Sequence, residues 1–325
     1  MNQGTVNVIL GSGGAIGTPL ALQLVAEGER VHAVSRGGKA PAGTQPVRAD
    51  LTDAGQTEAA VPEGATVFLL VGLPYDARVW KVQWPRIIRN AAAACRSKGA
   101  RLIFLDNVYM YGAVDGPMTE DTPIRPSSEK GRIRADVAGY LLAEMQSGRV
   151  TASIARAADF YGPHATASSI PYVLALEPLM RGRRPRWLID ARKLHSYSYT
   201  MDCAKALRLL ARAQDSFGQV WHLPTMHPPI TGDEFIRIAA KTLGTPAGYS
   251  ILSRPMLALA GLFNRQILEL SRMTYQNDRD YLFDSTKFEK RFGFQPTSYQ
   301  AGIEETLRFA SHGAAPSAKE AARSG

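Results

Sequence analysis

The chain is poor in cysteine and has no long apolar run. Cys95 and Cys203 are its two cysteines among 325 residues. Neither stands in a metal-ligand spacing or beside a candidate base, which disfavours a disulfide scaffold, a metal cluster and a thiol nucleophile. The longest uncharged apolar stretch, residues 255–263, is far shorter than the ~18 residues of a membrane span. With no cleavable leader before the first strand, we expect a reduced, cytoplasmic protein that does not enter a membrane.

Concentrated charge is also scarce, although the formal net charge is +9. The basic residues are scattered except for a cluster between Arg181 and Lys193. No zinc-finger, recognition-helix or RNA-stacking pattern accompanies that cluster, so we expect no nucleic-acid partner. The cluster is either a solvated loop or a surface that attracts an anionic substrate. An apolar fraction of 45% and a charged fraction of 21% are those of an ordinary globular protein.

What the chain does have is a regular alternation of strands and helices. Helices are expected at about 18–28, 79–98 and 129–147, and strands at 5–10, 30–35, 46–49, 66–71, 101–106 and 150–157. Strands that are apolar on both faces belong in a parallel sheet covered by helices. The predicted fold class is α/β, a doubly wound parallel sheet of the Rossmann type, with ligands at the carboxyl ends of the strands.

The alternation becomes irregular and mostly helical beyond residue 163. We expect a nucleotide-binding Rossmann domain made of residues 1–163 plus 194–222, because ligands lie at the carboxyl ends of its strands. A smaller, mostly helical substrate-side domain would be made of residues 164–193 plus 223–311. Residues 312–325 are small and polar, and they are expected to form a disordered tail. A small-molecule substrate would bind between the two domains.

The most informative segment is the glycine-rich turn GSGGAIG at 11–17, directly after the first expected strand. A glycine permits the tight exit from the strand, the approach of backbone to phosphate, and the close packing of the next helix. The N–H groups of such a turn and helix N-terminus bind a pyrophosphate. We therefore predict a dinucleotide site, with a plain glycine turn as the alternative. The turn would contribute Gly11, Ser12, Gly14, Ala15, Ile16 and Gly17.

The second expected strand ends in Ser35 and Arg36 instead of an acidic residue. An Asp or Glu at this place would accept hydrogen bonds from the ribose hydroxyls of NAD, whereas an arginine beside a small hydroxyl suits a 2′-phosphate. The sequence therefore predicts NADP as the cofactor. NAD stays open as the alternative, because Arg36 is also compatible with being a solvated charge in a basic loop.

Several segments together resemble the extended short-chain dehydrogenase/reductase superfamily, in particular its NAD-dependent epimerase/dehydratase family. The likeness covers nearly the whole chain. It rests on GSGGAIG at 11–17, ADLTD at 49–53, VYMYG at 108–112, RAADFYGP at 156–163, YTMDCAKAL at 199–207 and FDSTKFEKRFGFQP at 283–296. The resemblance implies the Rossmann fold and a nicotinamide cofactor. It also implies a homodimer through the helices near 79–98 and 129–147.

The resemblance further assigns residues to parts of the cofactor. Asp50 and Leu51 would contact the adenine, and the loop that carries Tyr161 would close near the nicotinamide. The residues that would run along the ribose side are Val71, Gly72 and Leu73.

The catalytic pattern of the family is where this chain departs from it. Family members carry a Ser or Thr four residues before the Tyr of a YG motif, and a Tyr and a Lys four apart on the next long helix. Here these positions are Asn107, Lys130 and Arg134. Lys130 is the candidate acid or base if burial or Arg134 lowers its pKa. Asn107 is the candidate donor to a substrate carbonyl, and Tyr109 or Tyr111 could supply a phenol.

Each of these candidates has a structural alternative: a solvated cation for Lys130, a turn former for Asn107, a packed ring for the nearby Tyr111. Family members that act on sugar nucleotides also carry an arginine where this chain has His195, which makes nucleotide-sugar epimerisation less favoured. The leading hypothesis is an NADP-dependent oxidoreductase for a small or medium carbonyl or alcohol substrate. The alternatives are an NAD(P)-dependent epimerase or dehydratase of a sugar-like substrate, and a non-catalytic NADP-binding redox sensor.

Overall fold

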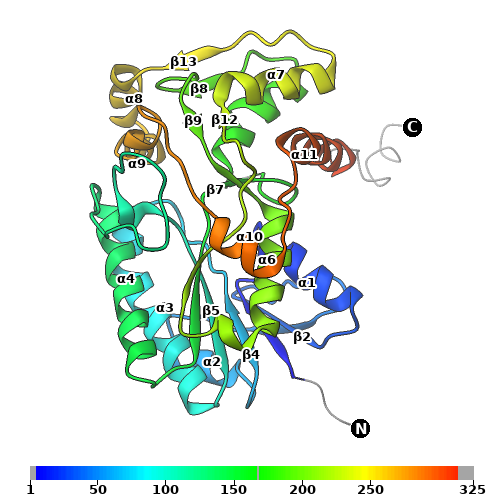
Figure 1. Cartoon of the computed structure of the whole chain (residues 1–325), viewed down its shortest axis with the longest axis vertical. Coiled ribbons are helices and arrows are strands. Elements are labelled where there is room, and N and C mark those ends of the chain that lie inside the picture. Colours follow the sequence, from blue (N-terminus) through cyan, green and yellow to red (C-terminus); the bar gives the residue numbers. More distant parts are fainter. Residues whose placement is uncertain (1–4, 167, 314–325) are drawn as a thin grey trace.

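A seven-stranded sheet forms the centre of the protein, whose computed structural model describes residues 5–166 and 168–313 (Figure 1). The strand order is β11-β6-β5-β4-β1-β2-β3, and every neighbouring pair is parallel. The strands are β1 (Asn7–Leu10), β2 (Val31–Ser35), β3 (Gln45–Arg48), β4 (Thr66–Leu69), β5 (Arg101–Asp106), β6 (Ala152–Arg156) and β11 (Val220–His222). All residues of β1, β4 and β6 are buried, which is typical of central strands covered on both faces.

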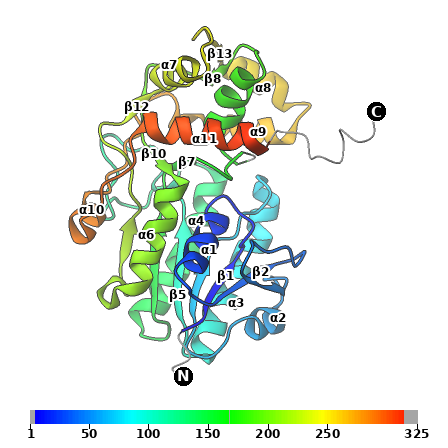
Figure 2. The same cartoon turned by 90° about the vertical axis from the view of Figure 1, so that its right-hand side faces the viewer.

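Helices cover both faces of this sheet (Figure 2). The helices are α1 (Gly17–Ala26), α2 (Ala54–Ala59), α3 (Ala77–Ser97), α4 (Glu129–Gln146) and α6 (Thr200–Arg212). One apolar core lies between the sheet and α3 and α4, and a second lies between the sheet and α1 and α6. The sheet is therefore doubly wound, and the predicted fold class is confirmed.

Local sequence explains where the two long helices begin and which face they bury. Asp76 caps α3 by accepting from the N–H of Arg78, and Ser128 caps α4 by accepting from the N–H of Gly131. The buried side of α3 carries Trp80 and Trp84, one helical turn apart. Both helices therefore start at the carboxyl edge of the sheet with a fixed orientation.

The remaining elements form a smaller lobe over the carboxyl ends of the strands (Figures 1 and 2). Its core is rich in aromatic rings, including Tyr197, Tyr199, Phe235 and Tyr299. The lobe contains β7 (Asp159–Tyr161), the π-helical turn η2 (Tyr172–Leu176), α5 (Glu177–Met180), β8 (Arg186–Leu188), β9 (Leu194–His195), β10 (Tyr197–Tyr199), β12 (Ile230–Thr231), α7 (Gly232–Leu243), β13 (Ser250–Leu252), α8 (Arg254–Gly261), α9 (Arg265–Ser271), η4 (Thr274–Gln276) and α11 (Tyr299–Gly313). The helix α10 (Thr286–Phe292) packs instead against β11 of the large sheet. Two further 3₁₀ turns are η1 (Tyr109–Tyr111) and η3 (Gln214–Ser216).

Two expected boundaries differ from the structure. Residues 194–199, which we expected to return to the nucleotide domain, form β9 and β10, and these pair with β12 and β7 outside the large sheet. The rings of Tyr197 and Tyr199 hold this segment in the aromatic core of the smaller lobe. The expected tail from residue 312 is also partly wrong, because α11 continues to Gly313. Residues 314–325 lie outside the described part.

Among the residues that the structure describes, no helix combines the length and the apolar character that crossing a membrane requires. The same residues contain no group of three or more His, Cys, Asp or Glu side chains placed to hold a metal ion.

The close packing of α1 on the glycine turn gives a test of the fold. A Cβ at Gly17 would lie 2.7 Å from the backbone oxygen of Gly11, whereas a Cβ at Gly13 would meet no described atom within 4 Å. We expect Gly17→Ala to lower the free energy of unfolding by about 1–3 kcal/mol, measured by urea denaturation. The control Gly13→Ala is expected to stay within about 0.5 kcal/mol of the parent. Equal stability of the two variants would contradict the packing role.

Candidate functional site

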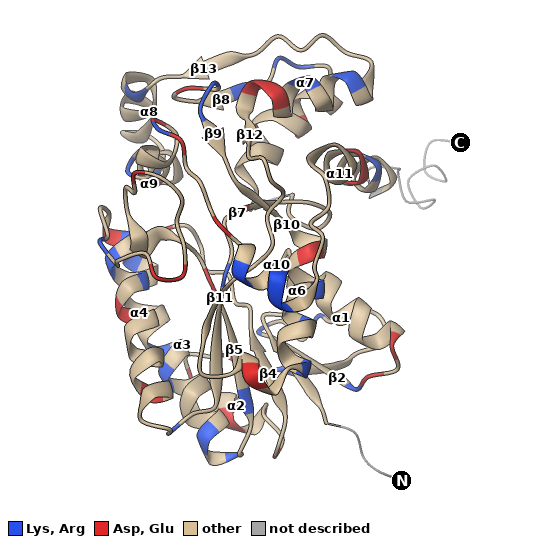
Figure 3. Ribbon diagram, viewed as in Figure 1, with Lys and Arg blue, Asp and Glu red and all other residues tan. Residues whose placement is uncertain are grey.

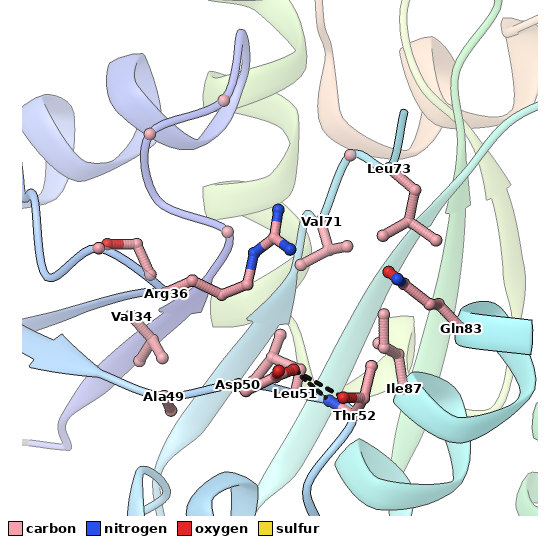
Figure 4. A pocket seen from close by; sticks show the side chains of 16 residues that line it. Val34, Arg36, Ala49, Asp50, Leu51, Thr52, Val71, Leu73, Gln83 and Ile87 are labelled. Atoms are coloured by element: carbon pink, nitrogen blue, oxygen red, sulfur yellow. Dashed lines mark hydrogen bonds between the residues drawn. The ribbon is translucent and has the colours of Figure 1, made fainter. Parts of the chain in front are cut away.

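A pocket of about 470 Å³ opens at the carboxyl ends of β1, β2 and β4 (Figure 4). It lies where the strand order reverses, since β1 has β2 on one side and β4 on the other. This switch point is the usual ligand site of an open parallel sheet. The lining residues are Gly11, Gly13, Gly14, Val34, Ser35, Arg36, Gly37, Ala49, Asp50, Leu51, Thr52, Val71, Gly72, Leu73, Gln83 and Ile87.

The glycine turn forms one wall of this pocket. Gly11 has a φ of +96°, and a Cβ on it would lie 2.8 Å from Cα of Val71, so only glycine fits between the two strands. Gly13 and Gly14 present backbone to the pocket, and the N-cap residue of α1, Ile16, makes no side-chain cap. The N–H of Thr18 already donates to the backbone oxygen of Gly14, and Pro19 has no N–H. The donors left for an anion therefore lie in the turn itself and at Gly17, the first helical residue. The turn therefore fits the diphosphate of a dinucleotide.

Four of the predicted turn residues support the wall without lining it. The Oγ of Ser12 is directed away and donates to the backbone oxygen of Val34 at 3.4 Å. The side chain of Ile16 is buried in the core beside α6. The other two residues that lie outside the lining are Ala15 and Gly17.

Arg36 and Asp50 both line the pocket; in Figure 4 Arg36 extends toward Val71, and the carboxylate of Asp50 points toward Thr52. Asp50 accepts hydrogen bonds from the N–H of Thr52 at 2.9 Å and from its hydroxyl at 2.8 Å. These bonds hold the pKa of Asp50 below its ordinary value, and the positive charge of Arg36 adds to that effect. Ser35 donates to the backbone oxygen of Lys39 at 2.9 Å. Arg36 therefore places a guanidinium in the pocket, next to the end of β2.

The other predicted lining residues, Leu51 and the stretch from Val71 to Leu73, are also in the pocket. Sequence reasoning missed Gln83 and Ile87, which reach the pocket from α3 (Figure 4). The sequence signal that could have found them is their spacing of four residues, which puts both on one face of the helix that follows residues 71–73.

Tyr161 requires a correction. Its ring is 1% exposed and packs in the core of the smaller lobe, with ring centroids 5.3 Å from Tyr199 and 5.7 Å from Phe235. A Cβ at Gly302 would come within 2.5 Å of the Tyr161 hydroxyl, which shows how tightly the ring is enclosed. Tyr161 is a core residue and is not part of the pocket.

Lys130 lies in a buried ion pair that joins the two lobes. Its side chain is 2% exposed, and its Nζ is 2.6 Å from Oε2 of Glu269 on α9. The ammonium also lies 3.8 Å from the ring centroid of Tyr75, in the loop after the pocket segment. Burial lowers the pKa of Lys130, and Glu269 acts in the opposite direction. The structural alternative of a solvated helix-start cation is therefore wrong.

Arg134, one turn further along α4, is held by Asp106 at the end of β5. Its Nε donates to Oδ1 of Asp106 at 2.8 Å, and its guanidinium lies 4.1 Å from the ring centroid of Trp84. Both side chains are almost fully buried. The positive charge at this position is therefore committed to a structural ion pair.

Asn107 and Tyr109 form the turn that follows β5. The Oδ1 of Asn107 accepts from the N–H of Tyr109 at 3.1 Å, so the turn-forming role of Asn107 is present. Tyr109 stacks on Trp80 with ring centroids 6.3 Å apart. Burial raises the pKa of Tyr109 well above its ordinary value, which keeps its phenol protonated. Tyr75, whose ring contacts Lys130, also packs edge-on against Trp80, and Trp80 stacks on Tyr109. The turn and Lys130 therefore lie on two sides of the loop that carries Tyr75.

Beyond these candidates, Asp106 belongs to a buried chain of polar groups. Oδ2 of Asp106 lies 3.8 Å from Nε of Arg156, and Nη1 of Arg156 donates to the hydroxyl of Tyr111 at 2.6 Å. That hydroxyl is 2.7 Å from Nε2 of His222, whose Nδ1 is 2.8 Å from the backbone oxygen of Asp284. The chain links the ends of β5, β6 and β11.

A family model described as the NAD dependent epimerase/dehydratase family matches residues 7–223. The chain belongs to this family. The resemblance noted from the sequence is thereby confirmed, and the family member is an NAD(P)-dependent oxidoreductase or epimerase/dehydratase with a nicotinamide dinucleotide as cofactor. A search of curated proteins found no match.

Solved structures of low sequence identity share the fold over nearly the whole chain. A dTDP-glucose 4,6-dehydratase from Bacillus anthracis, in complex with NAD, matches with a TM-score of 0.78 at 13% identity, covering 95% of this chain and 97% of its own. A UDP-glucose 4-epimerase from Thermus thermophilus, in complex with NAD, matches with a TM-score of 0.77 at 20% identity, covering 96% and 100%. A UDP-glucuronic acid 4-epimerase from Bacillus cereus matches with a TM-score of 0.77 at 16% identity, covering 95% and 99%.

The buried histidine of the polar chain predicts a dependence of stability on pH. Burial lowers the pKa of His222 to about 3. Below pH 6.5 the imidazole is therefore still neutral in the folded protein, whereas it is protonated in the unfolded chain. This stability is fully present above pH 6.5 and is lost as the pH falls toward 3. Between pH 7 and pH 5 we expect a loss of about 2 kcal/mol that His222→Gln removes, measured by urea unfolding. An unchanged pH dependence in His222→Gln would contradict this assignment.

Proposed function

We propose that this family member is an NADP-dependent oxidoreductase that transfers a hydride between its cofactor and a small or medium carbonyl or alcohol compound. The observation that carries the choice of NADP is Arg36 extending over the pocket from the end of β2 (Figure 4), where an acidic residue would favour NAD. When bound, the nicotinamide supplies the hydride, and the protein supplies binding, orientation and the proton.

The pocket residues can be assigned to successive parts of a bound dinucleotide. The glycine turn and the start of α1 would hold the diphosphate, and Arg36 with Ser35 would hold the 2′-phosphate. Asp50 and Leu51 would contact the adenine, and the stretch from Val71 to Leu73 would follow the ribose toward Tyr75. The nicotinamide end would then lie near Lys130, whose Nζ contacts the Tyr75 ring.

Lys130 is our proposed proton donor. It is a buried titratable group on the helix that carries the acid and base in the family, and burial shifts its pKa toward neutrality. Glu269 keeps it protonated in the resting protein and would be the partner left behind when the proton moves to substrate. Asn107 would orient the substrate oxygen with its amide N–H₂ group, because its Oδ1 is engaged by Tyr109.

An internal hydride transfer is the first alternative, and the family itself favours it. The solved relatives with this fold are described as sugar-nucleotide dehydratases and epimerases with NAD. An epimerase or dehydratase would return the cofactor unchanged, so absorbance of NADPH would show no net change during turnover. The oxidoreductase consumes NADPH in proportion to product.

A redox sensor is the alternative from another class. The two positive charges at the catalytic positions of α4 are both engaged, Lys130 by Glu269 and Arg134 by Asp106. A protein that uses both charges for structure would bind the cofactor and turn nothing over. Tight binding that distinguishes NADP from NADPH, with no turnover on any carbonyl compound, would identify this function.

Arg36 gives the direct test of cofactor choice. We expect Arg36→Ala to weaken NADP binding by about 10–100-fold, since a charge-assisted phosphate contact of about 1.5–3 kcal/mol is lost. NAD binding is expected to change by less than about threefold in the same variant. Isothermal titration calorimetry measures both. Lys39→Ala removes a neighbouring exposed cation and serves as the control; equal loss in both variants would point to general charge instead of phosphate recognition.

Lys130 gives the test of proton transfer, in which Lys130→Arg keeps the positive charge opposite Glu269 but cannot release a proton at neutral pH. We expect NADP affinity to remain and kcat to fall by about 10²–10⁴-fold on a carbonyl substrate found by screening with NADPH. The melting temperature of the variant controls for misfolding. A kcat within about tenfold of the parent would exclude Lys130 as the donor.

A further inference from the structure

A cluster of polar side chains between the two lobes is not explained by the fold or by the cofactor pocket. Asp159 at the start of β7 lies at its centre, with its Oδ2 3.2 Å from Nε2 of His195 on β9. The ring of His195 is tilted against that of Tyr281 with centroids 5.4 Å apart, and Tyr281 lies edge-on to Tyr275 at 6.3 Å. The cluster thus combines residues from three separate parts of the smaller lobe.

The nucleotide lobe closes the other side of this cluster. The carboxylate of Asp159 acts on the pKa of Tyr75 and Tyr109 as well as on those of Tyr275 and Tyr281; burial raises all four, and the negative charge adds to the effect. Tyr75 and Tyr109 belong to the loops that follow β4 and β5. The cluster therefore lies at the carboxyl edge of the sheet, next to the loop that leads away from the cofactor pocket.

Within the described residues, several polar atoms of this cluster are buried without a hydrogen-bond partner. They are Nε2 of His195, which is close to Asp159 but misaligned for a hydrogen bond, and the terminal atoms of three neighbours: Oη of Tyr275, Nε2 of Gln276 and Oη of Tyr281. His195, Gln276 and Tyr281 are each at least 95% buried. Tyr281 interacts with the neighbouring side chains of Gln276 and Tyr275, and Tyr275 with those of Ser127 and Ser128, so these groups partly satisfy one another. Because a buried polar group without a well-aligned partner costs about 1–3 kcal/mol, a ligand that bears hydroxyl groups would complete the hydrogen bonding of the cluster.

The charge of the cluster limits which class of ligand can bind there. Asp159 contributes a carboxylate, and its partner His195 carries a full positive charge only when protonated. The nearby cation Lys130 is neutralised by Glu269 at 2.6 Å. A phosphate or diphosphate placed here would meet a carboxylate with no uncommitted Lys or Arg from the described cluster to balance it.

We infer that Asp159, His195, Tyr275, Gln276 and Tyr281 form the substrate site and that the substrate is an uncharged, hydroxyl-bearing compound without a phosphate. Phenols, an amide and an imidazole provide donors, and the carboxylate accepts from a hydroxyl group. The aromatic rings cover the apolar face of such a compound. This inference rests on the proposed function, because it places the substrate beside the nicotinamide end of the pocket.

The test removes the carboxylate while keeping its shape. With the full chain saturated with NADP, we measure binding of UDP-glucose by calorimetry to the parent, to Asp159→Asn and to Asp136→Asn, an exposed carboxylate on α4. We expect no measurable binding to the parent or to the control. Asp159→Asn is expected to gain at least about tenfold in affinity, which is about 1.4 kcal/mol.

Every outcome of this measurement is decisive. Binding of UDP-glucose by the parent would overturn the inference, because the carboxylate then does not exclude a diphosphate. Absence of binding by Asp159→Asn would overturn it as well, because another feature then excludes the ligand. NADP binding is measured on the same samples, so a failure of the proposed cofactor site is visible separately.

A second variant tests whether the unpartnered hydroxyl serves a ligand or the fold. Tyr281→Phe removes the Oη atom that has no hydrogen-bond partner among the described residues and keeps the ring. We expect its melting temperature to equal or exceed that of the parent, and KM for an active carbonyl substrate to rise with little change in kcat. A clearly lower melting temperature would show that the hydroxyl stabilises the fold, and it would remove Tyr281 from the site.

Discussion

The arrangement of the whole sheet edge depends on the carboxylate of Asp106. This single buried group ends β5, pairs with Arg134 of α4 and lies close to Arg156 of β6. Through Arg156, Tyr111 and His222 the same chain of polar contacts reaches β11. Removing one partner of such a buried pair typically costs about 3–5 kcal/mol, because the other charge is left uncompensated. The orientation of α4, and with it the position of Lys130, follows from this pairing.

The residues that line the pocket could be predicted from the sequence because the features that place them there are local. Gly11 and Gly14 are fixed by a turn that a strand and a helix require, and Arg36 and Asp50 follow directly after strands. Residues that end parallel strands must meet at one edge, so their proximity needs no knowledge of tertiary packing. Gln83 and Ile87 were missed because a helix face is identified only once its neighbours are known.

The sequence predicted little of the proposed substrate half, because its contacts join residues that are far apart in the chain. Lys130 could be singled out, but Glu269 lies 139 positions further along the chain and belongs to no recognisable pattern with it. Tyr161 was assigned to the cofactor on the family resemblance, yet its ring packs with those of Tyr199, Phe235 and Tyr299 in another core. His195 was known as a departure from the family, whereas its pairing with Asp159 emerged from the fold. The positions and contacts of these side chains depend on partners that are distant in the sequence.

The ion pair between Lys130 and Glu269 has a consequence for how the two lobes move. Because α4 belongs to the sheet and α9 to the smaller lobe, pulling the lobes apart at this point would expose two opposite charges that now neutralise each other inside the protein. The ion pair thus stabilises the arrangement in which the two lobes are in contact on this side. A substrate that enters such a cleft meets groups already in place, and its binding free energy is not consumed in bringing two domains together.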